Sequence, residues 1–136
     1  MDDLVEAARE ARANAYAPYS GFAVGAAVET SDGSVFTGSN VETVNYSNTL
    51  HAEEVAVGKA VSAGHTVIGR VAVSASSKDG LRPCGMCRQT LAEFCTEDAI
   101  VLCDEGEKAA PSSYRMGELL PHTMAPTDLG VDPGRE

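Results

Sequence analysis

Apolar side chains recur at helical spacing in several stretches of the chain. Residues 3–15 place apolar side chains on one face among glutamates and arginines, which predicts an amphipathic helix. A second helix is predicted over residues 51–63, where Gly64 closes it, and a third over residues 84–94. Residues 114–120 predict a further short helix.

Apolar runs without helical spacing mark the predicted strands. Residues 22–30 and 35–38 flank the turn sequence at 31–34, Ser-Asp-Gly-Ser, and together they predict a β-hairpin. Residues 68–75 and 99–103 are runs of the kind found in strands that are covered on both faces. Because helices alternate with these strands, the predicted fold class is α/β, with a sheet between layers of helices.

The length and composition fit one globular domain. The chain has 136 residues, of which 43% are hydrophobic and 22% charged. A domain of this size removes roughly 70% of its unfolded surface from water, so it can form a real core. We expect a single domain over residues 1–136, with a loose tail from about residue 126 because Gly and Pro recur there.

The charge balance is strongly acidic. Twenty acidic residues oppose ten basic ones, which gives a net charge of −10 at pH 7. Such a field repels phosphate backbones and anionic membranes, so neither a nucleic acid nor a membrane is an expected partner. The acidic residues 1–4 are unlike a secretory signal, and no apolar run approaches the ~20 residues of a membrane span. We expect a cytoplasmic protein whose cysteines are thiols or metal ligands and not disulfides.

Two cysteines carry the first candidate chemistry. Cys84 and Cys87 are three positions apart at the start of a predicted helix, so both thiols can face the same way. The partial positive charge of a helix N-terminus favours thiolates, and two thiolates on one face indicate a soft metal, usually zinc. A redox-active pair is the main alternative for this C-x-x-C spacing.

His51 and Glu53 add a third ligand type and an acid–base group. Positions i and i+2 do not share a helix face, so the two can flank one site only if His51 lies at or before the first turn. The polar loop that ends at Leu50 allows this. A lone His is more often an ordinary polar residue, but a redox pair would leave both His51 and Glu53 unexplained.

The number of zinc ligands separates a catalytic site from a structural one. Three protein ligands leave an open position for water, whereas structural zinc has four. Cys95 lies roughly 12 Å from Cys87 along the predicted helix axis and cannot reach the site, and Cys103 falls in a predicted buried strand. His65 and His122 remain candidates for a fourth ligand, which would make the protein a zinc-stapled binding module without chemistry. An open site is favoured.

The chain resembles the small homotetrameric cytidine deaminases over nearly its whole length. H-x-E followed by P-C-x-x-C is the signature of zinc nucleobase deaminases, and residues 18–27, 38–42, 83–94 and 118–121 extend the likeness. The resemblance implies a three-layer α/β/α fold with a mixed five-stranded sheet, one Zn²⁺ per chain and a homotetramer. The implied activity is hydrolysis of cytidine and deoxycytidine to uridine and deoxyuridine plus ammonia, in pyrimidine salvage, by zinc-activated water with Glu53 as proton shuttle.

The resemblance also implies a set of substrate-binding residues. Asn40 and Glu42 match a pair that hydrogen-bonds the ribose 3′-hydroxyl, and Phe22 matches an aromatic residue packed against the pyrimidine. Ala52 matches a residue whose backbone amide meets the base, and Tyr46 matches an aromatic residue near a neighbouring subunit's site. From the residues alone, each has an ordinary alternative in core packing or a solvated loop. The same chemistry on another aminopyrimidine, such as a nucleoside antibiotic, is the nearest alternative function, and Asn40 and Glu42 argue for a nucleoside.

Three positions depart from the pattern of the small enzymes. His51 stands where they usually have Cys, and Glu54 stands where they usually have Arg. The two changes fit together, because three thiolates would leave the zinc centre at −1 and an Arg would relieve that charge, whereas a neutral His removes the excess. Met124 stands where a Phe usually touches substrate across the subunit interface, which puts that contact in question.

Overall fold

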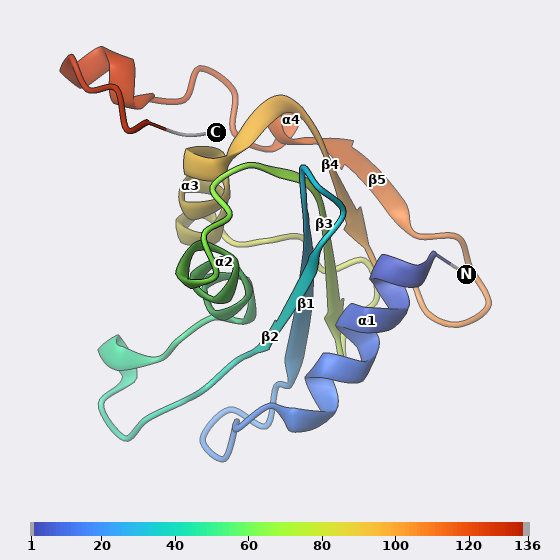
Figure 1. Cartoon of the computed structure of the whole chain (residues 1–136). Helices are drawn as coiled ribbons and strands as arrows, with labels where there is room; N and C mark the ends of the chain where they lie inside the picture. The colour runs from blue at the N-terminus through green and yellow to red at the C-terminus, as the bar shows by residue number, and fades with distance from the viewer. Residues whose placement is uncertain (1, 135–136) are drawn as a thin grey trace.

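Within residues 2–134, which the computed structural model describes, a five-stranded sheet has the strand order β2-β1-β3-β4-β5 (Figure 1). The elements in chain order are α1 (Asp3–Ala11), η1 (Arg12–Asn14), β1 (Val24–Thr30), β2 (Val35–Ser39), η2 (Tyr46–Asn48), α2 (Ala52–Ser62), β3 (Ile68–Ala75), α3 (Gly85–Phe94), β4 (Cys95–Cys103), β5 (Ser112–Arg115), α4 (Met116–Leu119) and η3 (Pro126–Leu129), where η marks a 3-10 helix.

The sheet is mixed, as the resemblance implied. β1 runs antiparallel to both of its neighbours, β2 and β3, whereas β3 and β4 are parallel and are joined by the crossover helix α3. Val24 therefore pairs with Ala75, and Gly25 pairs with Ser39. The start of β1, the end of β2 and the carboxyl ends of β3 and β4 thus share one edge of the sheet, which we call the carboxyl edge.

Helices cover both faces of the sheet, which confirms the three-layer α/β/α fold. Figure 1 shows α1 on one face and α2 and α3 on the other. Successive strand residues point to opposite faces, so Ala26 and Val28 pack in the core beneath α2, while Ala27 packs with Leu4 and Val5 of α1. The apolar runs of the sequence are therefore strands buried on both sides.

Two glycines let the helices lie directly against the sheet. A Cβ at Gly25 would stand 2.0 Å from the Ala8 carbonyl oxygen in α1, and one at Gly38 would stand 2.5 Å from the Ala52 carbonyl oxygen in α2. Any side chain at these positions would push the helix away from the strand. Gly38 therefore allows the first turn of α2 to lie close to β2.

Several predicted boundaries were wrong. α1 ends at Ala11 and is followed by a 3-10 turn, so it is shorter than the predicted helix over residues 3–15. Residues 112–115 form the edge strand β5, although the sequence predicted a helix from residue 114. The side chains of β5 alternate between half-buried and exposed, so this strand lacks a continuous apolar run. β4 begins at Cys95, directly after α3, because Cys95 already pairs with Ile68 of β3.

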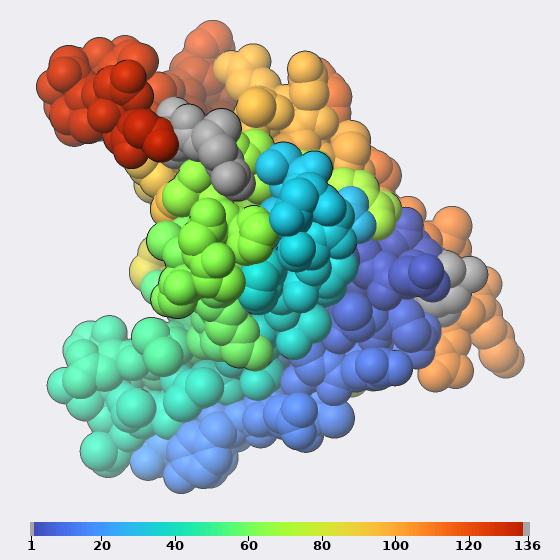
Figure 2. Space-filling model, viewed as in Figure 1, coloured from blue at the N-terminus to red at the C-terminus, as the bar shows by residue number. Residues whose placement is uncertain are grey.

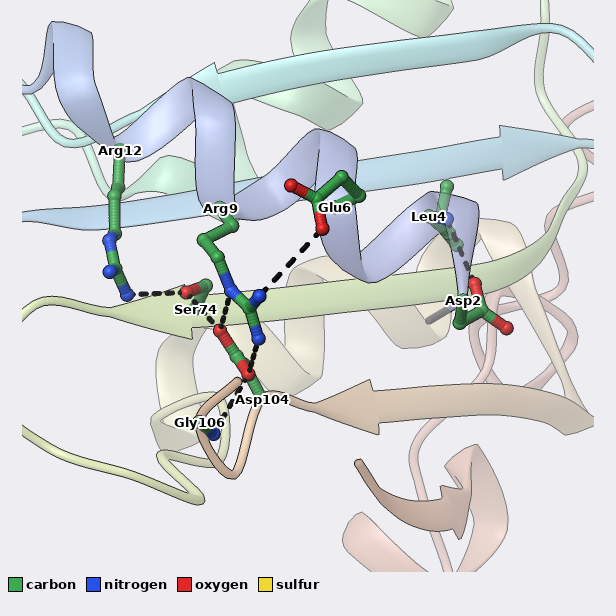
Figure 3. Close-up of polar contacts among 8 residues, drawn as sticks. All are labelled: Asp2, Leu4, Glu6, Arg9, Arg12, Ser74, Asp104 and Gly106. Atoms are coloured by element: carbon green, nitrogen blue, oxygen red, sulfur yellow. Dashed lines mark hydrogen bonds and ion pairs between the residues drawn. The ribbon is translucent and has the colours of Figure 1, made fainter. Parts of the chain in front are cut away.

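A buried polar network ties α1 to the carboxyl edge (Figure 3). Arg9 donates hydrogen bonds to both carboxylate oxygens of Asp104, at 2.9 and 2.6 Å, and the two side chains are only 11% and 5% exposed. Asp104 also accepts from the Ser74 hydroxyl at 2.7 Å and from the Gly106 N–H at 3.0 Å. Arg12 completes the network by donating to the Ser74 hydroxyl at 2.8 Å. The Arg9 guanidinium lowers the pKa of Asp104 to about 2.

The C-terminal segment extends away from the body of the molecule (Figure 2). Residues 126–129 form the 3-10 helix η3, and residues 127–134 are exposed. The last two residues of the predicted tail, 135–136, lie outside the described residues. Across residues 2–134, no helix combines the length and the apolar character needed to cross a membrane.

Candidate active site

The carboxyl edge brings together segments that are far apart in the sequence. Phe22 lies just before β1, Asn40 follows β2, and the loop after β3 leads to Cys84. His51 lies at the start of α2, whose first turn packs against β2 at Gly38. Open α/β sheets commonly bind ligands at this edge, and the candidate residues of the sequence gather there.

His51, Cys84 and Cys87 form one cluster. Nδ1 of His51 lies 3.4 Å from Sγ of Cys84 and 3.3 Å from Sγ of Cys87. The three potential ligand atoms lie within 4.8 Å of one another. His51 is the N-cap of α2 and Cys84 is the N-cap of α3. His51 thus precedes the first helical turn, as the sequence argument required.

The donor set of this cluster fits a zinc ion. Cys87 is fully buried, and burial, followed by the negative charge of Glu53, raises the pKa of its thiol. The sequence argument expected the helix N-terminus to favour thiolates, whereas burial at Cys87 acts in the opposite direction. A bound cation would hold the sulfur as a thiolate. Two sulfurs and an imidazole nitrogen this close together suit Zn²⁺.

Glu53 lies in the first turn of α2, beside the cluster. Glu53 is only 5% exposed. Burial raises the pKa of its carboxyl group, whereas backbone hydrogen bonding and the charge of His51 act in the opposite direction. A carboxyl group with a raised pKa can carry a proton closer to neutral pH, which suits a general acid and base.

Glu54 holds the backbone of His51. The Glu54 carboxylate accepts a hydrogen bond from the His51 N–H at 2.9 Å, which is the contact that the third helical residue makes in a capping box. The glutamate that departs from the pattern of the small enzymes therefore has a local structural reason, because it fixes the residue where α2 begins.

Among the described residues, the cluster gains no fourth ligand from His, Cys, Asp or Glu. His65 lies at the β1–β2 hairpin instead, 3.8 Å from Asp32 and against the ring of Phe36. His122 is exposed in the segment after α4. This arrangement argues against a zinc-stapled module closed by either histidine.

The two remaining cysteines also lie outside the cluster. Cys103 is buried at the end of β4, as predicted, and burial raises the pKa of its thiol to about 11. Cys95 is the C-cap of α3, so the length of this helix separates it from Cys87, as the sequence argument expected.

A cavity of about 310 Å³ opens beside the cluster. This volume is within the usual range for small-molecule sites. A larger hollow of about 420 Å³ lies among β4, α4 and the segment after it, and it shares no residue with the first. The lining of the smaller cavity consists of Ser20, Phe22, Val24, Asn40, Glu42, Thr49, His51, Ala52, Glu53, Leu81, Arg82 and Cys84.

Asn40 holds the segment that leads from Phe22 into β1. Its side-chain amide donates to the Phe22 carbonyl at 2.8 Å, and its side-chain oxygen accepts from the Val24 N–H at 2.9 Å. These bonds replace the strand ladder, which is why β1 begins at Val24 and not at residue 22. One amide hydrogen of Asn40 has no part in them and is available to a ligand.

Glu42 is held with its carboxylate toward the same cavity. One oxygen accepts hydrogen bonds from the backbone N–H groups of Tyr19 and Ser20, at 3.1 and 3.0 Å. The other accepts from the Ser20 hydroxyl. The Ser20 hydrogen bonds are the largest cause that lowers the pKa of Glu42. An ionised carboxylate has lone pairs left to accept from a ligand hydroxyl.

The other predicted binding residues divide into two groups. Ala52 is buried in the cavity wall at the first position of α2. Tyr46 does not line this cavity: it is 70% exposed and packs edge-on against Tyr19, with ring centroids 5.7 Å apart. Met124 lines the larger hollow and is also exposed.

Several residues that line the cavity carry no signal of their own in the sequence: Ser20, Thr49, Leu81 and Arg82. Ser20 lies within the segment 18–27 that carried the resemblance, which is the one signal available for it. Figure 2 shows the segment around Ser20 (blue) and the loop after β2 (teal) projecting together from the body. Backbone hydrogen bonds join the two segments, from the Tyr16 N–H to Asn40 and from the Glu42 N–H to Tyr16. The cavity wall therefore depends on a long-range pairing.

A three-layer sandwich with a His–Cys–Cys cluster beside a buried glutamate defines a zinc-dependent hydrolytic enzyme. The model of the family described as cytidine and deoxycytidylate deaminase zinc-binding region matches residues 1–103. The chain therefore belongs to the cytidine and deoxycytidylate deaminase family, and it is a zinc enzyme.

Individual relatives agree with this family. The cytidine deaminase of Halalkalibacterium halodurans is 40% identical over 93% of this chain and 95% of its own. The crystal structure of cytidine deaminase from Burkholderia pseudomallei matches with a TM-score of 0.83 and 38% identity, covering 90% of this chain and 97% of the other. That of the Mycobacterium tuberculosis cytidine deaminase matches with a TM-score of 0.78 and 39% identity, covering 90% and 94%.

Proposed function

We propose that this enzyme hydrolyses cytidine and deoxycytidine to uridine and deoxyuridine with release of ammonia. The observation that carries the proposal is the placement of Glu53, a buried carboxyl group beside the His51, Cys84 and Cys87 cluster in the wall of a cavity of about 310 Å³. The relatives named as cytidine deaminases support the substrate class.

Glu53 is the proton carrier of the proposed reaction. Hydrolysis forms a bond between a water oxygen and C4 of the pyrimidine, and it breaks the bond between C4 and the amino nitrogen. Glu53 takes a proton from the water and delivers it to N3. It then moves the remaining hydroxyl proton to the amino nitrogen, which leaves as ammonia. Burial suits the carboxyl to hold a proton between these transfers, because it raises the pKa.

His51, Cys84 and Cys87 hold the zinc ion in this proposal. When bound, zinc supplies a Lewis acid that brings the pKa of a coordinated water close to ~7. The chain restrains two of these ligands in different ways. Glu54 fixes the backbone of His51 at 2.9 Å, and full burial restrains Cys87.

The nucleoside is held by other residues that line the cavity. Glu42 accepts a hydrogen bond from a ribose hydroxyl, and Asn40 donates its remaining amide hydrogen to the same sugar. Phe22 packs against the pyrimidine, and the backbone N–H of Ala52 faces the base. The support for these roles is that all four residues line the cavity and that Asn40 orients the backbone of Phe22.

The enzyme also assembles as a homotetramer in this proposal, with Tyr46 reaching a neighbouring subunit's cavity. The support is a set of exposed apolar side chains close in sequence to residues that line the cavity, namely Tyr19, Val44, Tyr46, Leu50 and Met86. Light scattering tests this assembly. A mass near four chains of 14.1 kDa would support it, whereas the mass of a single chain at working concentration would contradict it.

The function is tested by following the loss of cytidine absorbance in the ultraviolet, with zinc quantified on the same sample. We expect turnover of cytidine and deoxycytidine with about one zinc per chain, and loss of turnover after chelation. Turnover of another aminopyrimidine alone would replace the nucleoside assignment with the alternative substrate class. Folded protein that holds one zinc per chain and deaminates none of these compounds would contradict the proposal.

A further inference from the structure

We propose that Arg88 is a positioning residue, which fixes the peptide groups on both sides of Cys84 and so aims the Cys84 thiol at the zinc ion. The backbone N–H of Arg88 donates to the Cys84 carbonyl at 2.9 Å. Its side-chain Nε donates to the Pro83 carbonyl at 2.8 Å. Residue 88 therefore holds the carbonyl after the Cα atom of Cys84 through its backbone, as any helical residue there would, and the arginine side chain holds the carbonyl before it.

Cys84 needs such a restraint more than Cys87 does. Cys87 is fully buried, so packing restrains its side chain, whereas Cys84 is exposed and sits at the N-cap, outside the helical turn. The direction of its Cα–Cβ bond is set by the backbone torsions at residue 84. Since those torsions relate the two peptide groups that residue 88 holds, the Arg88 side chain restrains the direction in which the Cys84 side chain leaves the backbone.

The guanidinium group of Arg88 is itself anchored. Its Nη1 donates to the Leu119 carbonyl at 2.8 Å, which is the last carbonyl of α4. Pro83 is fully buried, so its carbonyl needs a partner inside the protein. The planar guanidinium group of arginine offers two nitrogens, so it donates to the Pro83 carbonyl and to the Leu119 carbonyl at the same time. Lysine carries the same charge but offers a single nitrogen on a flexible stem.

The test is the affinity for Zn²⁺, measured by competition with a chelator in the wild type, Arg88→Met and Arg88→Lys. Loss of a group that orients a metal ligand typically lowers affinity by about 10-fold or more, and we expect this for Arg88→Met. Arg88→Lys keeps the charge but not the two-carbonyl bridge, so it should also bind clearly more weakly than the wild type. Arg115→Met is the matched control, because it removes the same charge from an exposed arginine that contacts Asp98 and Glu118.

A second readout separates positioning from general weakening of the fold. Co²⁺ bound in place of zinc gives thiolate charge-transfer and d–d bands that report the ligand geometry. We expect these bands to change in both Arg88 variants and to match the wild type in Arg115→Met. The unfolding midpoint of each metal-free variant is measured first, and if Arg88→Met does not fold, Arg88→Lys carries the test.

Arg88 has this role only if the zinc site proposed above exists, and the two ideas fail differently. Wild-type protein that does not bind zinc would overturn the proposed function. Wild-type protein that binds zinc, with Arg88→Lys equal to it in affinity and in cobalt spectrum, would overturn the role of Arg88 alone, because charge without the bridge would then be sufficient.

Discussion

Two polar clusters at the carboxyl edge differ in how their charges are balanced. The cluster against α1 contains its own counter-charge, since Asp104 accepts two hydrogen bonds from Arg9. The cluster at the starts of α2 and α3 combines two thiols, an imidazole and the carboxyl of Glu53. The pKa values respond in opposite directions: Arg9 lowers the pKa of Asp104 to about 2, whereas burial raises the pKa of Glu53.

The difference separates a cluster that stabilises the fold from one that is suited to bind a metal ion. A buried carboxylate with a guanidinium partner and further donors is satisfied by the chain itself. Burial favours the protonated forms of the Cys87 thiol and the Glu53 carboxyl group, so an added cation changes their state. The geometry of the His51, Cys84 and Cys87 ligand atoms identifies the cluster that suits a metal, and the directions of the pKa shifts agree with it.

The largest effect is expected at Glu53. Glu53→Gln keeps the size of the side chain but removes its ability to transfer protons, so kcat should fall by about 10²–10⁴-fold while zinc is retained. Ultraviolet turnover and zinc content measured together check this. Glu10→Gln, the same change at an exposed residue of α1, should match the wild type. Normal turnover in Glu53→Gln would remove the proton-carrier role.

The next largest effect is expected when the cluster against α1 loses the negative charge that pairs with Arg9. Asp104→Asn leaves Arg9, whose side chain is 11% exposed, without a negative partner. Removing one member of a buried ion pair costs about 3–5 kcal/mol. Urea denaturation of the zinc-loaded protein measures this loss. A cost below about 1 kcal/mol, as for a surface pair, would show that the pair is not buried in solution.

The same pair should make stability depend on pH. A folded-state pKa below the unfolded value means that the contribution of Asp104 is fully present well above its ordinary pKa of 3.8 and is lost as pH falls through about 2. The contribution is worth about 2 kcal/mol. The difference in unfolding free energy between wild type and Asp104→Asn should shrink by about that amount between pH 5 and pH 2. A constant difference across this range would contradict it.

The smallest effect is expected at an ion pair of ordinary exposure. Arg70 contacts Glu29 at 3.1 Å, with side chains 35% and 31% exposed. Glu29→Gln should cost less than about 1 kcal/mol, and less still at high salt. If Glu29→Gln cost as much as Asp104→Asn in the same denaturation experiment, burial would not be what distinguishes the two pairs.

The fold was predictable where the sequence pattern is strong. Continuous apolar runs identified β3 and the end of β4, and helical spacing identified α2 and α3. β5 was missed because an edge strand with half-exposed polar residues gives neither signal. The end of α1 at Ala11 was missed because the local pattern there still favours a helix.

The zinc cluster was predictable because its residue types and spacing are distinctive. Polar roles that depend on partners distant in the sequence were not. Nothing near Asn40 predicts that its amide fixes the backbone of Phe22, and nothing near Arg88 predicts its bond to Leu119. Such contacts arise only when the strand order brings the segments together.

The most direct test is a titration of Zn²⁺ into metal-free protein, following the unfolding midpoint, proton release and cytidine turnover together. We expect all three to rise and to level off at one zinc per chain, because the metal displaces the proton of the buried Cys87 thiol and stabilises the folded state. Cys87→Ser should lose most of this response. Full turnover in metal-free protein, or zinc binding that neither releases protons nor stabilises the fold, would contradict a cluster that is completed by zinc.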